Sequence, residues 1–226
     1  MKYYIYISDA KVDMLFPQVP HDIKKKVALE FKMDLKLLSA SRRTETESED
    51  NRIARLETVV DFIREYGNVG TVDEPDEYIE GAMPVRWGPV VNDMMDSTVV
   101  YFGGQTDKTY LGLGGSMHYV IGSSGASSAN SRSATPVLLE YLYKELKVNE
   151  PISSFSERPE EYKTYLREAI TPAECIALAS TSLMGPLQNV EFLAKRLSYG
   201  AVESRDYEKR RPFALLATPL YVAMAD

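Results

Sequence analysis

The order in which strand-like and helix-like segments follow one another is the feature that most constrains the fold of this chain. Apolar residues that alternate with polar ones predict strands, and apolar residues spaced by three or four predict helices. Along the chain these patterns give strands, a helix, more strands, several helices and a final strand. A doubly wound fold would alternate strand and helix regularly. We therefore predict an α+β fold, with a mixed, mainly antiparallel sheet and helices packed on it.

The predicted strands differ in how they meet water. Tyr3 to Ile7 is an aromatic and β-branched run that predicts a buried first strand, and Leu29 to Leu37 alternates with charged residues, which predicts a long strand with one wet face. Further strands are expected at Tyr78–Val90, at Val99–Phe102 paired with Thr109–Leu113 in a hairpin, and at Phe213–Ala225. Pro84 suits an edge or a bulge. Gly114-Gly115 predicts a bulge that leads into a continued strand at Met117–Ile121.

Three segments carry helix signals. Ile53, Leu56, Val60 and Ile63 fall at helical spacing after Asn51, with Gly67 just past the end. Thr135-Pro136 and Thr171-Pro172-Ala173-Glu174 each place a capping hydroxyl before a proline, the second with a capping box. We expect a helix-rich part over about 135–200, interrupted at Gly185-Pro186, and a helical turn near Pro20 to Lys26.

Composition limits the class of protein. The chain has 226 residues, 44% hydrophobic and 26% charged, which predicts one globular domain over 1–226. Cys175 is the single cysteine, so we expect no disulfide or multi-cysteine metal site and interpret it as a small buried hydrophobe. No signal peptide and no apolar run of membrane-spanning length is present, so the expected location is the cytoplasm, with no membrane partner.

The net charge of −7 and the pI of 5.1 argue against extended nucleic-acid binding. Two short basic runs, Lys24-Lys25-Lys26 and Lys209-Arg210-Arg211, are interpreted as solvated surface.

The segment Gly112 to His118 combines glycines with polar side chains that could contact an anion. Met117 stands where a GxGxxG motif needs its third glycine, so the segment is either a structural bulge or a ligand cradle. For the cradle, the candidates are Gly114, Gly115, Ser116 and His118. The Ser- and Gly-rich stretch that follows leads to Arg132 and Thr135, which form either an anion site at a helix start or an ordinary loop and cap.

Two further groups carry alternatives. Arg86 and the single tryptophan, Trp87, either bind a ligand or partner together, or Trp87 packs in the core with Arg86 exposed. Asp9, Lys11 and Asp13 follow the first strand and form either a functional loop or a salt-bridged one. Two carboxylates do not make a metal site.

Nucleophilic catalysis has little support in the sequence. His21 and His118 are the only histidines, and no GxSxG motif occurs. Ser116 and His118 would share one face of a continued strand. The weak catalytic candidates are His118 with Asp9 or Asp13 as an acid-base pair for a phosphoester or nucleotide hydrolase.

Five segments resemble an uncharacterised family of bacterial proteins of about this length. They are residues 4–15 (YIYISDAKVDML), 70–75 (GTVDEP), 86–89 (RWGP), 100–104 (VYFGG) and 217–223 (ATPLYVA). The resemblance implies a bacterial cytoplasmic setting and an association with multi-gene regulatory or defence-type systems. That family has no established activity, so no functional residue is transferred from it.

Three functional hypotheses remain open. The leading one is a non-catalytic ligand-sensing or interaction domain that binds a small anionic or nucleotide-like ligand, with Gly112 to Thr135 as one pocket wall. The second is the small hydrolase, and the third is a structural subunit of a homo-oligomer that pairs through a strand. No cofactor is identified by the sequence.

Overall fold

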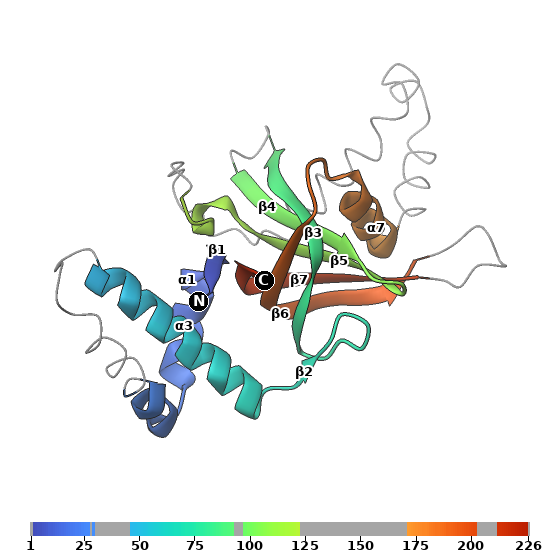
Figure 1. The fold of residues 1–226 in the computed structure, drawn as a ribbon. Helices are drawn as coiled ribbons and strands as arrows, with labels where there is room; N and C mark the ends of the chain where they lie inside the picture. The colour runs from blue at the N-terminus through green and yellow to red at the C-terminus, as the bar shows by residue number, and fades with distance from the viewer. Residues whose placement is uncertain are drawn as a thin grey trace, which may run out of the picture.

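The computed structural model describes residues 2–27, 29, 46–92, 97–122, 171–202 and 212–225. Seven strands form one mixed sheet with helices outside it, which confirms the α+β prediction (Figure 1). The strands are β1 (Tyr3–Ile7), β2 (Val69–Gly70), β3 (Tyr78–Asn92), β4 (Ser97–Gln105), β5 (Thr109–Ser116), β6 (Gln188–Ala201) and β7 (Phe213–Met224). The helices are α1 (Asp9–Leu15), α3 (Thr46–Tyr66) and α7 (Pro172–Ser182), with 3₁₀ turns η1 (Phe16–Gln18) and η2 (Met117–Tyr119). Residues 21–27 are also helical.

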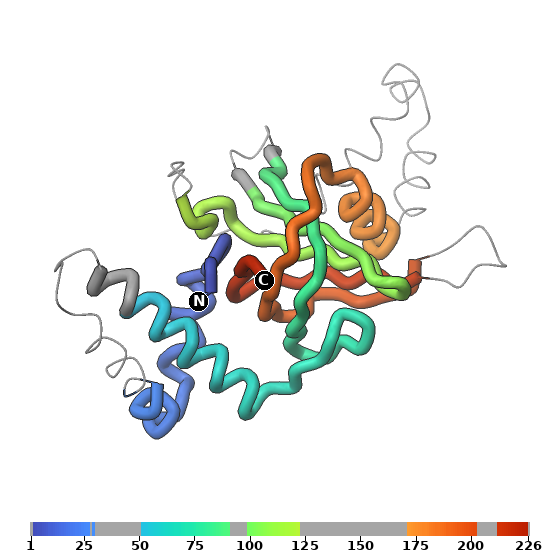
Figure 2. The backbone as a smooth tube through the Cα atoms, in the orientation of Figure 1, coloured from blue at the N-terminus to red at the C-terminus, as the bar shows by residue number. Residues whose placement is uncertain are grey.

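The sheet closes on itself. β4 pairs antiparallel with β3 and β5, β5 pairs parallel with β7, and β6 pairs antiparallel with both β7 and β3. These pairings form a closed ring in the order β3, β4, β5, β7, β6 and back to β3. Figure 2 shows the path of the backbone through these strands. β1 pairs with the last part of β7, and β2 adds to the start of β3.

The long strand β3 belongs to two ladders. Residues 78–85 pair with β6, and residues 85–92 pair with β4. Pro84, paired with Asn189, lies next to the residue where the partner changes. A proline is tolerated where pairing on one side stops, so the predicted strand is confirmed with Pro84 inside it.

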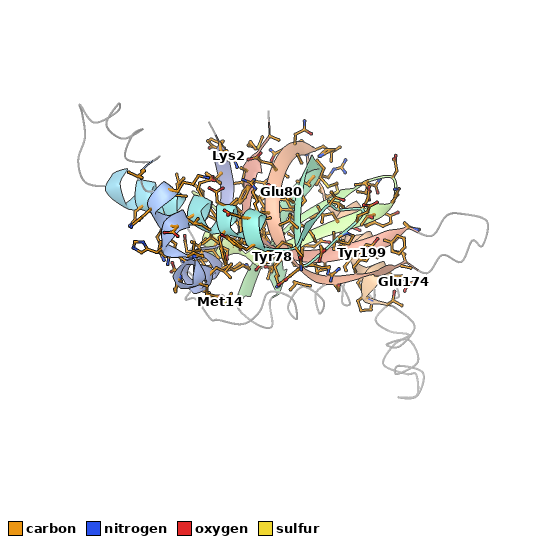
Figure 3. The ribbon with its side chains drawn as sticks, turned by 90° about the horizontal axis from the view of Figure 1, so that it is seen from below. Lys2, Met14, Tyr78, Glu80, Glu174 and Tyr199 are labelled. Carbon is orange, nitrogen blue, oxygen red and sulfur yellow. The ribbon has the colours of Figure 1, made fainter. Side chains whose placement is uncertain are left out.

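Three groups of buried side chains hold the layers together. The interior of the ring is filled from every strand of the ring and from β1, with Tyr6, Phe102, Leu113, Phe192 and Leu215 among the members. α7 covers the outer face of β4, β5 and β7, and α1 with α3 covers the outer face at the other end of β7. Seen from below, Met14 of α1 and Glu174 of α7 lie at opposite ends of the molecule (Figure 3).

Two of the three predicted helix signals lie in described residues, and both are confirmed. α3 buries Leu56, Val60 and Ile63 and ends directly before Gly67. α7 begins at the predicted capping box, in which Thr171 and Glu174 each bind the other's backbone N–H. Cys175 is buried, as predicted, and burial raises the pKa of its thiol.

Three predicted elements are wrong. Residues 9–13 form the helix α1 and not a loop. The helical region does not continue past Gly185-Pro186, because residues 188–201 form β6. β6 packs Phe192 into the ring and Leu193 against α3, so its middle, residues 192–194, is buried on both faces and this apolar run interrupts the alternation of the sequence.

The third error concerns Gly114-Gly115. Both glycines lie in regular β5 pairing, opposite Tyr101 and Val100, and η2 follows where a continued strand was predicted. The hairpin turn lies at residues 106–108, after Gly103 and Gly104, which belong to β4. Gly115 is required by close approach, since a Cβ there would lie 2.7 Å from Cζ of Tyr6 and closer still to its hydroxyl.

Other predictions fall largely outside the described residues. Of the strand expected at Leu29–Leu37 only Leu29 is described, and it is helical. The Ser- and Gly-rich stretch beyond Gly122, Arg132, the helix from Thr135 and the basic run at 209–211 are outside the described ranges.

We predict that Gly115→Ala lowers the free energy of unfolding by about 2 kcal/mol, because the added methyl overpacks a fully buried ring. Gly88→Ala is the matched control, since it is also a strand glycine and a Cβ there meets nothing within 4 Å. Urea unfolding measures both. Adding Tyr6→Phe to Gly115→Ala should recover part of the loss; equal stability of the two glycine variants would contradict the packing account.

Candidate functional site

A pocket of roughly 310 Å³ opens where the β3–β4 ladder meets the end of α7. Its lining comes from both strands, from α7 and from the segment that leads to β6. The lining residues are Pro84, Arg86, Gly103, Gly104, Gln105, Ser180, Thr181 and Leu187. The volume lies at the lower end of the range for small-molecule sites.

Arg86 is the charged residue of this lining. Its neighbours Val85 and Trp87 pack toward the ring interior, so strand alternation places Arg86 on the outer face together with Pro84. Arg86 Nε donates a hydrogen bond of 2.9 Å to the carbonyl oxygen of Gly185. Gly185 has a φ of +105°, a conformation that favours glycine, and this turn presents the carbonyl.

Arg86 has no carboxylate partner among the described residues. The basic residues that form ion pairs in the described ranges are Lys2, Arg52, Arg55, Arg64 and Lys195. Arg86 therefore faces the pocket with a guanidinium whose orientation is fixed through one nitrogen. A guanidinium held in this way is suited to bind a carboxylate or phosphate.

The floor of the pocket is backbone and closely packed. Gly103 is buried under α7, and a Cβ on it would lie 2.8 Å from both Ser180 Cα and Leu183 Cδ1. Ser180 is 6% exposed, and its hydroxyl donates to the carbonyl oxygen of Leu111 at 2.8 Å and lies 3.0 Å from the Tyr101 hydroxyl. Burial raises the pKa of Tyr101. These contacts fix the end of α7 on the sheet.

Trp87 lies on the opposite face of β3 from Arg86. Its ring stacks on the ring of Phe102, with the ring centroids 5.5 Å apart. Its Nε1 donates a hydrogen bond of 2.6 Å to Oε1 of Gln188. The two residues therefore do not share a pocket. Because Gln188 directly follows Leu187 of the pocket lining, the indole is a spectroscopic reporter of that wall.

The predicted cradle residues lie away from the pocket. Gly114 and Gly115 are buried in β5, and the Ser116 hydroxyl accepts the backbone N–H of His118 at 3.3 Å. The His118 side chain is exposed, with its ring against Tyr119. Since η2 begins after Ser116, the prediction that Ser116 and His118 share a strand face is wrong.

Asp9 and Asp13 are both paired with arginines of α3. The Asp9 carboxylate accepts two hydrogen bonds from Arg52, one from Nε at 2.7 Å and one from Nη2 at 2.8 Å. Nη2 of Arg55 lies 2.6 Å from Oδ1 of Asp13. The salt-bridged interpretation is confirmed, on a helix and not on a loop. In the described part of the chain, no group of three or more His, Cys, Asp or Glu side chains is placed to hold a metal ion.

Lys11 stands between these two ion pairs in sequence but binds a hydroxyl. Its Nζ donates to Ser8 Oγ at 3.1 Å, and Ser8 is only 1% exposed. Burial lowers the pKa of the Lys11 amine from 10.5 to about 8. Sequence reasoning missed this pair, although Lys11 stands three positions after Ser8, a spacing that brings side chains together on a helix.

We predict that Lys11→Met alters the pH dependence of stability. The Lys11 pKa is lowered in the folded state, so between about pH 8 and 10.5 the unfolded chain binds more protons and wild-type stability rises with pH. The free energy of unfolding of wild type relative to Lys11→Met should increase by about 2 kcal/mol between pH 7 and 10. Urea unfolding at several pH values measures it. Lys25→Met, at an exposed lysine, is the matched control. A pH-independent difference between wild type and Lys11→Met would contradict the lowered pKa of Lys11.

Arg132 and Thr135, the other ligand-binding candidates, are outside the described ranges. Among the helices of those ranges, none is both long and apolar enough to cross a bilayer.

One family model matches this chain, over residues 2–226, and its description is "Family of unknown function (DUF7019)". No curated protein and no solved structure matches the chain.

Proposed function

We propose, for a chain that belongs to the DUF7019 family of unknown function, a non-catalytic ligand-binding role in which the Arg86 pocket holds a small organic anion. The single observation that carries this proposal is the Arg86 guanidinium, oriented by the Gly185 carbonyl and without a carboxylate partner in the described part of the chain. A cation fixed at a pocket wall and not neutralised by the protein favours an anionic ligand.

The rest of the lining indicates what else the ligand carries. Thr181 and Gln105 contribute polar side chains, while Pro84 and Leu187 contribute apolar surface, with Leu187 54% exposed. An anion with a small apolar part would satisfy both. Pockets of this kind combine an apolar wall with a few polar groups that fix orientation.

The same lining favours binding over catalysis. The described lining residues include no His, Asp, Glu, Cys or Lys, so no side chain there has the pKa of a general acid or base near neutral pH. This chemistry supports the ligand-sensing hypothesis over a hydrolase at this pocket.

A route for signalling is present in the connection between α7 and β6. That segment contributes Gly185, which holds Arg86, and Leu187, which lines the pocket. A bound anion that draws Arg86 toward itself would change the Gly185 contact and the Gln188 hydrogen bond to Trp87. Binding of an anion in the pocket would thus change contacts at the start of β6.

We predict that inorganic phosphate and succinate, titrated at low salt, change Trp87 fluorescence, and that Arg86→Ala weakens their binding by roughly 10- to 100-fold, the loss expected for one charged hydrogen-bonding group. Arg196→Ala is the matched control. Arg196 is also a strand arginine bonded to a backbone carbonyl, that of Pro75, but it lies outside the pocket.

Equal affinities of wild type and Arg86→Ala, in variants with the same unfolding curve, would reject the pocket. Native mass spectrometry of gently purified protein provides a second test, because a retained small anion should be present in wild type and depleted in Arg86→Ala.

A further inference from the structure

Ser8 and Lys11 form a fixed pair at the end of β1. The backbone N–H of Ser8 donates a hydrogen bond of 2.8 Å to the carbonyl oxygen of Leu220. The Ser8 carbonyl oxygen accepts hydrogen bonds from the backbone N–H groups of Lys11 and Val12, at 3.1 and 3.0 Å. Ser8 is therefore held by β7 on one side and by α1 on the other. The Lys11 amine returns to the Ser8 hydroxyl over one helical turn.

The Ser8 side chain departs from the usual role of its position. A serine that precedes a helix normally accepts a backbone N–H of the first turn. Here no such side-chain bond forms, and Ser8 Oγ accepts the Lys11 amine instead. Side chains that depart from the usual local pattern, here the capping bond of a serine before a helix, are expected at functional positions.

The surrounding charges leave Lys11 without a counter-ion. Asp9 and Asp13, on the same helix, are engaged by Arg52 and Arg55 of α3. No ion pair to Lys11 forms within the described ranges. Tyr6 of β1 has its pKa raised by burial and carries no charge at neutral pH. A half-buried amine in such a setting favours its neutral form.

We infer that Lys11 is a nucleophilic amine that condenses reversibly with small aldehydes or ketones. The Nζ lone pair forms a bond to the carbonyl carbon, and the carbonyl oxygen takes up a proton as the amine gives one up, with the Ser8 hydroxyl in place to relay it. Loss of the second N–H proton with the hydroxyl group releases water and leaves an imine. Amine and carbonyl are thus converted to imine and water, with no change of oxidation state.

The lowered pKa supports this reactivity. At about pH 7.5, an amine with a pKa of about 8 is neutral in roughly a quarter of molecules, against about one in a thousand for the ordinary value of 10.5. Lower basicity removes part of this gain, as it does for thiols. A net advantage of about tenfold over an exposed lysine remains.

The proposed amine site is separate from the Arg86 pocket. α1 and α7 lie on opposite sides of the closed sheet (Figure 1). Failure of one proposal therefore leaves the other standing.

The test is labelling of the full chain with a limiting amount of propanal and sodium cyanoborohydride, which reduces the imine to a stable secondary amine. Peptide mass spectrometry then gives the rate at each lysine. At about pH 7.5 Lys11 should react about tenfold faster than the exposed Lys25 and Lys108, and its rate should level off above about pH 8.

Ser8→Ala keeps the amine and removes the hydroxyl, so it should slow labelling of Lys11 alone. Arg196→Ala, at a strand arginine outside both proposed sites, should leave all rates unchanged. Lys11 labelled no faster than Lys25 and Lys108 in the wild-type protein would overturn the inference, whatever the stability of the variants.

Discussion

Backbone hydrogen bonding to β7 is the constraint on which the rest of the structure depends. One edge of β7 pairs with β6 over nearly its whole length, and the other edge pairs with β5 at its start and β1 at its end. The ring can close only because this strand accepts both neighbours. Its register with β6 shifts between Leu193 and Ala194, whose partners Tyr221 and Pro219 skip Leu220. On the other edge, the Leu220 carbonyl accepts the N–H of Ser8 and continues the β1–β7 ladder past the pair Ile7 and Tyr221, which positions the start of α1.

The closeness of packing around the ring explains why the pocket lies where it does. α7 approaches the sheet over Gly103, where a side chain would collide with Ser180, and the sheet there presents backbone to the helix. Beyond Ser182 the chain turns at Gly185 and returns as β6. The space between that turn and the β3–β4 ladder is the pocket, and Arg86 is the strand residue that points into it.

The fold class followed from sequence because β-prone runs and the helix starts that carry caps are encoded within a few residues. Thr171 to Glu174 predicted the start of α7, and Tyr78 to Val90 predicted β3. β6 was missed because its middle, residues 192–194, is buried on both faces, and the role of Gly115 was missed because its neighbour, Tyr6, is distant in sequence. Arg86 was singled out, but its separation from Trp87 and its contact with Gly185 depend on pairing between distant segments. The Ser8–Lys11 spacing was readable in the sequence, whereas the engagement of Asp9 and Asp13 by α3 was not.

The parallel pairing of β5 with β7 has a consequence for how the chain reaches its native state. Thr109 meets Phe213 across about a hundred intervening residues, and parallel pairing of this range is slow because the loop entropy is lost before the contacts form. During synthesis β5 emerges long before its partner, so the hairpin of β4 and β5 has an open edge until β7 leaves the ribosome. Glycines occupy Gly112, Gly114 and Gly115 along that edge strand, and their low β-propensity weakens pairing with foreign strands during this interval. Gly112 and Gly115, which admit the rings of Tyr101 and Tyr6 in the finished core, thus also lower the β-propensity of this edge while it is unpaired.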